Sequence, residues 1–387
     1  MLSNSNPNPF LTSATQLPQP KHDWLQEIWE QPQVIQSCID PFLSSHRHPS
    51  SSPLNLEKLA VLEFHSHRIH IVASGSSWHA ALVGKYVMEQ LAGIPTEVFV
   101  ASEYVDALPP LTPHTLTILV CPSGESADIV VAAKVELQRR ASQRYLLNSR
   151  LLALTNQPDS SLEQLADFTI HIPVGDKNAI APSQTFVAQL TIFYILAVAR
   201  ASWGQTLSAT QLEQFIDGLK SLPDLMKGML STQECHVRAI AADLAKTRTC
   251  ILLGRGINYP IALEGALALK QTHCINARGY AAGEFNHGPK AIVSDNLPLI
   301  VIAPPTSAVY NQVLKNARDM KALGGRLIGI TSPDNPDAVE LFEQILPIPV
   351  ADEWLCPVLS VIPLQLLAYY LKDEPICSNG RSDICVP

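Results

Sequence analysis

The stretch LTILVCPS at residues 116–123 decides the fold of this chain, because it returns in apolar outline as PLIVIAPP at residues 298–305. Three other stretches repeat in the same order: HIVASG at 70–75 as CILLGRG at 250–256, LLALT at 151–155 as LIGIT at 327–331, and FTIHIPV at 168–174 as QILPIPV at 344–350. The repeated unit is far longer than the repeat of a solenoid. The pattern therefore predicts two copies of one α/β domain in tandem, and the cleft between them is the expected place for a ligand.

Each copy alternates between continuous apolar runs and helical stretches. Such runs are typical of strands buried on both faces of a parallel sheet, and the alternation is typical of a doubly wound α/β domain. The helices expected in the first copy are 78–91, 127–138 and 184–201.

The predicted boundaries follow from this alternation. They are a disordered segment 1–21, an N-terminal helix and linker 22–53, a first domain 54–206, two linking helices in 207–247, a second domain 248–371 and a tail 372–387. Thr210 followed by Glu213 predicts a capping box at the start of the linking helices.

Composition limits the classes of function. The chain has 387 residues, is 47% apolar and carries a formal net charge of −8, which argues against a nucleic-acid-binding surface. No apolar run suggests a transmembrane helix and the N-terminus lacks the features of a signal peptide, so we expect a cytoplasmic protein that does not bind membranes. The eight cysteines form no CxxC pair and are interpreted as reduced thiols. The histidines show no metal-ligand spacing, so neither a metal nor another cofactor is expected.

Two loops in the first copy carry small hydroxylic residues where a strand gives way to a helix. They are SGSS at 74–77 and CPSGESAD at 121–128. A parallel sheet binds ligands at the carboxyl ends of its strands, glycine permits a close backbone approach, and a helix N-terminus favours an anion. These loops predict a phosphate site made without lysine or metal. The alternative is that their serines are ordinary helix caps and turns.

The sequence from Ser123 to Asp128 resembles the S-G-E-[ST]-x-[DE] signature of sugar-isomerase (SIS) domains. Longer stretches resemble the isomerase half of the glucosamine-6-phosphate synthase family, the glutamine–fructose-6-phosphate aminotransferases. They are EIWEQP at 27–32, LAGIP at 91–95, ASE at 101–103, GRG at 254–256, YPIALEGAL at 259–267, YAAGE at 280–284, HGP at 287–289 and PLQLLAY at 363–369.

This resemblance implies that the chain binds a sugar phosphate through a defined set of residues. They are Ser76, Ser77, Cys121, Pro122, Ser123, Ser126 and Ser183. Pro122 departs from the family, which has glutamine there, and proline has no N–H to donate. Two further departures follow, Pro182 for a hydroxyl residue and Gln184 for a basic one. Residue 2 is leucine rather than the glutaminase cysteine, so we expect no use of glutamine as amino donor.

Aldose–ketose interconversion needs a base between C1 and C2 and an acid/base that opens the ring. The resemblance places the ring-opening histidine at His287, but the carboxylate position is Gln271, the active-site lysine position is Ala268, and the tail has no lysine. Glu264 and Glu284 are weak candidates for a replacement carboxylate, and the alternative is that they are structural residues of a helix face and a loop.

Two interpretations stay open. In one, the protein is an isomerase- or deaminase-like enzyme acting on a hexose or hexosamine 6-phosphate through His287. In the other, catalysis has lapsed and a sugar-phosphate sensor remains. A third, less favoured, is an aminotransferase served by a separate glutaminase. The resemblance also implies a homodimer in which His287 completes the partner's pocket.

Overall fold

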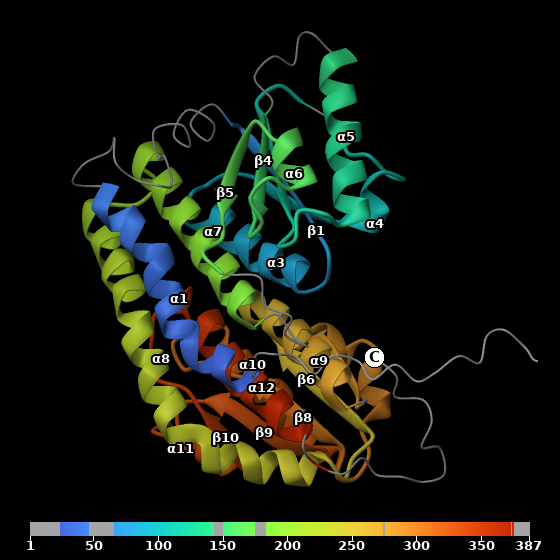
Figure 1. Ribbon diagram of the computed structural model, residues 1–387. Coiled ribbons are helices and arrows are strands. Elements are labelled where there is room, and N and C mark those ends of the chain that lie inside the picture. Colours follow the sequence, from blue (N-terminus) through green and yellow to red (C-terminus); the bar gives the residue numbers. More distant parts are fainter. Residues whose placement is uncertain are drawn as a thin grey trace, which may run out of the picture.

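The computed structural model of the chain describes residues 24–45, 66–110, 112–142, 150–174, 183–273, 275–372 and 374. The predicted disorder at 1–21, most of the linker, Pro182 and the tail beyond residue 374 lie outside the described residues. The described chain forms two five-stranded parallel sheets with helices on both faces, so the predicted tandem α/β architecture is confirmed (Figure 1).

The first sheet has the strand order β2-β1-β3-β4-β5, in which the chain turns back between β1 and β3. Its elements, in chain order, are β1 (Arg68–Ala73), α3 (Gly75–Gln90), β2 (Thr96–Val100), α4 (Ala101–Tyr104), β3 (Thr115–Val120), α5 (Ala127–Ser142), β4 (Arg150–Thr155), α6 (Ser161–Leu165), β5 (Phe168–His171) and α7 (Ser183–Gly204).

The second sheet repeats this order as β7-β6-β8-β9-β10. Its elements are α8 (Ala209–Leu244), β6 (Thr249–Gly254), η2 (Gly256–Asn258), α9 (Tyr259–His273), β7 (Asn276–Ala281), η3 (Glu284–Asn286), η4 (Pro289–Ile292), β8 (Pro298–Ile302), α10 (Tyr310–Ala322), β9 (Arg326–Thr331), α11 (Pro336–Leu341), β10 (Gln344–Pro347) and α12 (Cys356–Lys372).

A single hydrophobic core joins the two domains. It contains buried side chains of α3 and α7 from the first domain and of α9 and α12 from the second, together with α8 and α1 (Trp24–Ser45). Figure 1 shows α1 and α8 running along the pair of sheets. The sheet faces turned away from this helical layer have smaller cores, formed with α4 to α6 in one domain and with α10 and α11 in the other.

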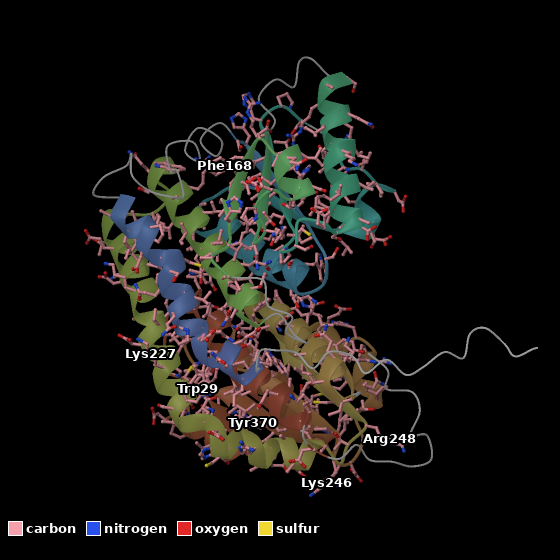
Figure 2. The ribbon with its side chains drawn as sticks, viewed as in Figure 1. Trp29, Phe168, Lys227, Lys246, Arg248 and Tyr370 are labelled. Carbon is pink, nitrogen blue, oxygen red and sulfur yellow. The ribbon has the colours of Figure 1, made fainter. Side chains whose placement is uncertain are left out.

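The helical layer is also held at its polar margin. Arg238 of α8 lies 4.2 Å from the centre of the Tyr370 ring on α12, which Figure 2 labels. Stacking of a guanidinium on an aromatic face contributes about 0.5–1 kcal/mol at exposed sites. It therefore adds to, but does not replace, the apolar packing between α8 and α12.

Two predictions about residues 207–247 were wrong. This region forms one helix, α8, with Pro223 inside it, because the buried seam that includes Leu222 and Met226 continues past the proline. The capping box uses Ser208 and Gln211 rather than Thr210 and Glu213, since Ser208 has the extended backbone of a cap.

The apolar runs also missed one edge strand in each sheet, β2 and β7. One described helix, Ser183–Gly204, is long and apolar enough to cross a membrane, although no apolar run suggested one. Because 83% of that stretch is buried inside the protein, we interpret α7 as a core helix.

Candidate functional site at the first domain switch point

The two serine loops lie side by side because their strands are neighbours. Strands β1 and β3 pair in parallel, with Val72 opposite Leu119, so the loops that follow them leave the sheet at the same edge. The sheet also turns back between these strands, which is where doubly wound domains form their ligand crevice. The structure therefore brings together residues 74–77 and 121–126, as the sequence predicted.

The loop after β1 presents one open hydroxyl and one engaged hydroxyl. Ser74 is the N-cap of α3 but makes no side-chain cap bond, and Gly75 has φ +56. Ser76 is partly exposed, and the described residues offer its hydroxyl no hydrogen-bond partner. Ser77 is buried, and its Oγ accepts a hydrogen bond of 2.9 Å from Gln189 Nε2 on α7. Ser76 is thus ready to donate to a ligand, whereas Ser77 connects the loop to the core.

The loop after β3 is held in one shape by its neighbours. Gly124 has φ +67, and a Cβ there would stand 2.2 Å from Ser160 Oγ, so only glycine fits. Glu125 Oε1 accepts the Ser161 N–H at 2.7 Å, and this backbone hydrogen bond lowers the pKa of the Glu125 carboxyl group. Glu125 therefore anchors the loop to α6.

The serines of this second loop differ in what remains open. Ser123 Oγ accepts the Glu125 N–H at 3.2 Å and lies 3.5 Å from Cys121 Sγ, a contact in which either the hydroxyl or the thiol can be the donor. Ser126 directly precedes α5 and its hydroxyl has no partner among the described residues. Pro122 contributes only its carbonyl oxygen, which accepts from Thr155 Oγ1 and from the Asn156 N–H.

In the second domain, the counterpart of the loop after β3 is the loop after β8, and its donors are already satisfied from within the chain. Thr306 Oγ1 donates to the Ala351 carbonyl at 2.7 Å. Ser307 Oγ and the Ala308 N–H both donate to Glu353 Oε1, at 2.8 and 3.2 Å. A carboxylate of the chain thus takes the donors of this loop, whereas the Ser126 hydroxyl of the loop after β3 has no partner among the described residues.

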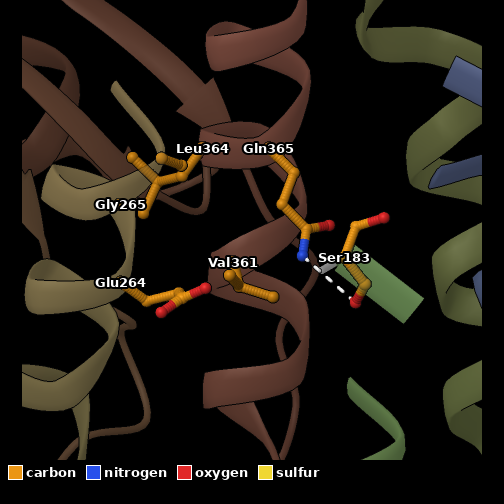
Figure 3. Close-up of a pocket in the computed structure, with 7 residues that line it drawn as sticks. Ser183, Glu264, Gly265, Val361, Leu364 and Gln365 are labelled. Carbon is orange, nitrogen blue, oxygen red and sulfur yellow. Dashed lines mark hydrogen bonds between the residues drawn. The ribbon is translucent and has the colours of Figure 1, made fainter. Parts of the chain in front are cut away.

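Within the described chain, Ser183 has no hydrogen bond to the serine loops. It is the first described residue of α7, is 2% exposed, and lines a small cavity between the domains with six residues of α9 and α12, shown in Figure 3. The volume open to the centre of a water molecule is about 10 Å³, about enough for a single water. Ser183 Oγ is buried without a partner, while its carbonyl accepts from Gln365 Nε2 at 3.5 Å.

The same cavity borders an ion pair that sequence reasoning missed. His79 Nδ1 on α3 lies 2.7 Å from Glu264 Oε2 on α9, and both side chains are about nine-tenths buried, at 10% and 9% exposed. This contact bridges the two domains beside the serine loops. Glu264 was a candidate from the sequence, but nothing in the pattern connected it to a histidine 185 positions away.

The residues expected from the resemblance around Gln271 are scattered. Gln271 is exposed, and Ala268 lines the small cavity. Glu284 and His287 are exposed at the ends of η3, where the His287 N–H donates to the Glu284 carbonyl at 2.9 Å. Within the described chain, no hydrogen bond or ion pair connects the His287 side chain to the serine loops or to Glu264.

Metal-ligand geometry is not found in the part of the chain that the structure describes, where no group of three His, Cys, Asp or Glu side chains could hold an ion. Five cysteines are described and all are free. Burial raises the pKa of the thiols of Cys38, Cys250 and Cys356 to about 12, so these are not nucleophiles near neutral pH.

Comparison with known proteins matches the sequence of this chain to a family. The model of the SIS domain matches residues 64–199 and 243–372. The chain is 46% identical, over 353 residues, to a protein of Thermosynechococcus vestitus named glutamine–fructose-6-phosphate aminotransferase (isomerizing). That match covers 91% of this chain and 56% of the relative, so the chain spans little more than half the length of this curated relative.

Solved structures show the same arrangement. The C-terminal domain of glucosamine-fructose-6-phosphate aminotransferase from Francisella tularensis superposes with a TM-score of 0.80 at 30% identity, covering 91% of this chain and 96% of that one. A glucosamine-6-phosphate deaminase from Thermotoga maritima has a TM-score of 0.64 at 21% identity, covering 90% and 93% of the two chains. The second likeness shows the fold alone.

Proposed function

This chain belongs to the SIS domain family, and we propose that it binds a hexose or hexosamine 6-phosphate between the two serine loops of its first domain. The observation that carries the proposal is the difference between the loop after β3 and its counterpart after β8. Among the described residues the Ser126 hydroxyl, like that of Ser76 in the neighbouring loop, has no partner, whereas in the second domain Glu353 occupies the donors of Ser307 and Ala308. A phosphate oxygen can complete the first set and would have to displace a carboxylate from the second.

The chemical step that fits this site is isomerase- or deaminase-like chemistry on the bound sugar. Aldose–ketose interconversion requires only proton transfers, which side chains can supply without a cofactor. His287 is the retained ring-opening candidate, and its exposure is consistent with a role in the pocket of a second subunit of a cytoplasmic homodimer. Glu284 stays a weaker candidate because it is exposed and its carbonyl serves the η3 turn.

A non-catalytic sugar-phosphate sensor is the second candidate function, and the exposed amide of Gln271 favours it. A carboxamide cannot accept a proton near neutral pH, so the position that the resemblance assigns to the base is inert in this chain. Binding without turnover would then signal the level of the sugar phosphate to a partner protein.

Calorimetry on the purified chain tests the binding proposal. Titration with fructose 6-phosphate, glucosamine 6-phosphate and unphosphorylated fructose should give heat for the phosphorylated sugars only, with one site per chain. The double variant Ser76→Ala with Ser126→Ala should lose about tenfold or more in affinity, because each removes a donor to a charged group. The matched control is Ser307→Ala in the second domain, which should bind as the unaltered chain does. Absence of heat for every phosphorylated sugar, or equal affinity of the double variant, would refute the proposal.

A further inference from the structure

We propose that His79 and Glu264 form the acid–base pair of the site, with His79 Nε2 as the group that moves the proton between sugar carbons. This inference rests on the proposed function, since it requires a phosphorylated sugar at the serine loops. His79 supplies the base that the Gln271 amide cannot be, from a position where no sequence pattern indicated one.

In the proposed pair Glu264 is an ionised carboxylate, which can only accept, so the 2.7 Å contact with Glu264 Oε2 places the hydrogen on His79 Nδ1. In the neutral imidazole the lone pair then belongs to Nε2. A carboxylate that orients a histidine in this way and stabilises its protonated form is a recurring device for making a general base.

His79 Nε2 makes no hydrogen bond to any of the described residues. The side chain is 10% exposed, so the imidazole is held through Nδ1 while its second nitrogen has no partner in the described chain.

The pair also stands at the right place relative to the phosphate loops. His79 follows Ser76 by three residues on α3, so both lie on one face of that helix with Cβ atoms about 5–6 Å apart. An open-chain six-carbon sugar held at Ser76 by its phosphate is longer than one helical turn of about 5.4 Å. Its carbons 1 and 2 can reach the imidazole while the phosphate stays between the loops.

Among the described residues, the second domain supplies Glu264 with no cation. Ala268, one turn further along α9, has a methyl group where the resemblance places a lysine, and it lines the cavity, which has room for about one water. Among the described residues, His79 is the one ion-pair partner of Glu264. The basic group of the site thus comes from α3 rather than from α9.

The step balances with protons alone. Neutral Nε2 takes a proton from C1 of the open-chain ketose, the C–H electron pair forms the C1–C2 double bond, and the C2 carbonyl oxygen takes a proton from water. The imidazolium then returns its proton to C2 while the C1 hydroxyl loses its proton to water and becomes the carbonyl. The products are the aldose phosphate and the original form of the pair.

Chemical rescue tests this role in the full chain. Fructose 6-phosphate in deuterated water should exchange hydrogen at C1 and give an aldose phosphate deuterated at C2, followed by NMR. His79→Ala should lower the exchange rate about 10²–10⁴-fold while calorimetric affinity changes by less than about threefold. Added imidazole should restore exchange in His79→Ala. Glu264→Gln should lower the rate with the affinity kept. If His79→Ala does not fold, His79→Gln, which keeps a donor toward Glu264, replaces it and should show the same loss.

The matched control is His171→Ala, which removes another histidine–carboxylate pair, one that lies entirely within the first domain. His171 Nε2 lies 3.2 Å from Glu163 Oε1 on the exposed edge strand, so its loss should leave exchange unchanged. The inference is overturned if His79→Ala exchanges as fast as the unaltered chain, if imidazole restores nothing, or if the unaltered chain binds the sugar without exchange. Failure of the unaltered chain to bind any phosphorylated sugar would instead overturn the proposed function itself.

Discussion

Replacing Gly124 by alanine should damage both the stability of the first domain and its binding of phosphate. The φ angle of +67 is unfavourable for alanine by about 1–2 kcal/mol. The new Cβ would also meet Ser160 at 2.2 and 2.3 Å, and Ser160 is 2% exposed, so it cannot simply swing into solvent. Such overpacking costs about 1–3 kcal/mol, and we expect a total loss of about 2–5 kcal/mol.

Gly256→Ala is the matched control, because Gly256 has φ +57 and nothing lies within 4 Å of a Cβ built there. It should lose only the conformational term of about 1–2 kcal/mol. The free energies of unfolding of both variants are measured by urea unfolding, and the difference between their losses gives the cost of the contact with Ser160. Calorimetry should show weaker binding of the phosphorylated sugar for Gly124→Ala only. Equal stabilities for the two variants, or unchanged affinity of Gly124→Ala, would refute the description of this loop.

Two further predictions concern charge. Burial lowers the pKa of His70 to about 4, although the nearby Glu136 carboxylate acts in the opposite direction. Below pH 6.5 the folded chain therefore binds fewer protons than the unfolded chain. Its free energy of unfolding should fall by up to about 3 kcal/mol between pH 6.5 and 4. His70→Gln should flatten this part of the dependence, measured by urea unfolding across that range, and identical slopes would contradict the assignment. Glu353→Ala should free the donors of Ser307 and Ala308, so that inorganic phosphate raises the melting temperature of the variant more than that of the unaltered chain. An equal rise in both would show that Glu353 does not occupy an anion site.

The interior strands of both sheets could be predicted from the sequence because burial on both faces leaves continuous apolar runs, as in β3 and β8. The edge strands β5 and β10 were predicted as well, but the opposite edges β2 and β7 were not. β2 is partly exposed over its last three residues, which are its only apolar run, and β7 contains asparagine, arginine and glycine, so neither has an apolar run as long as that of β8. The unbroken α8 was also hidden, because Pro223 indicates a helix end unless tertiary packing continues past it.

The serine loops were predictable because each follows a recognisable strand within a few residues. The His79–Glu264 pair was not, since its two members come from different domains and no periodicity connects them. The contact of Glu353 with Ser307 and Ala308 was also hidden, because only the fold brings these residues of the second domain together. The spacing of Ser76 and His79 by three residues on one helix was hidden as well, because the predicted helix begins at residue 78 whereas α3 begins at Gly75.

The position of the phosphate between the two serine loops can be measured directly in a crystal of the chain soaked with fructose 6-phosphate. We expect density for one phosphate per chain, within hydrogen-bond distance of the Ser76 and Ser126 hydroxyls. Density against Ser307 in the second domain, or none at either switch point at a concentration well above the dissociation constant, would contradict it.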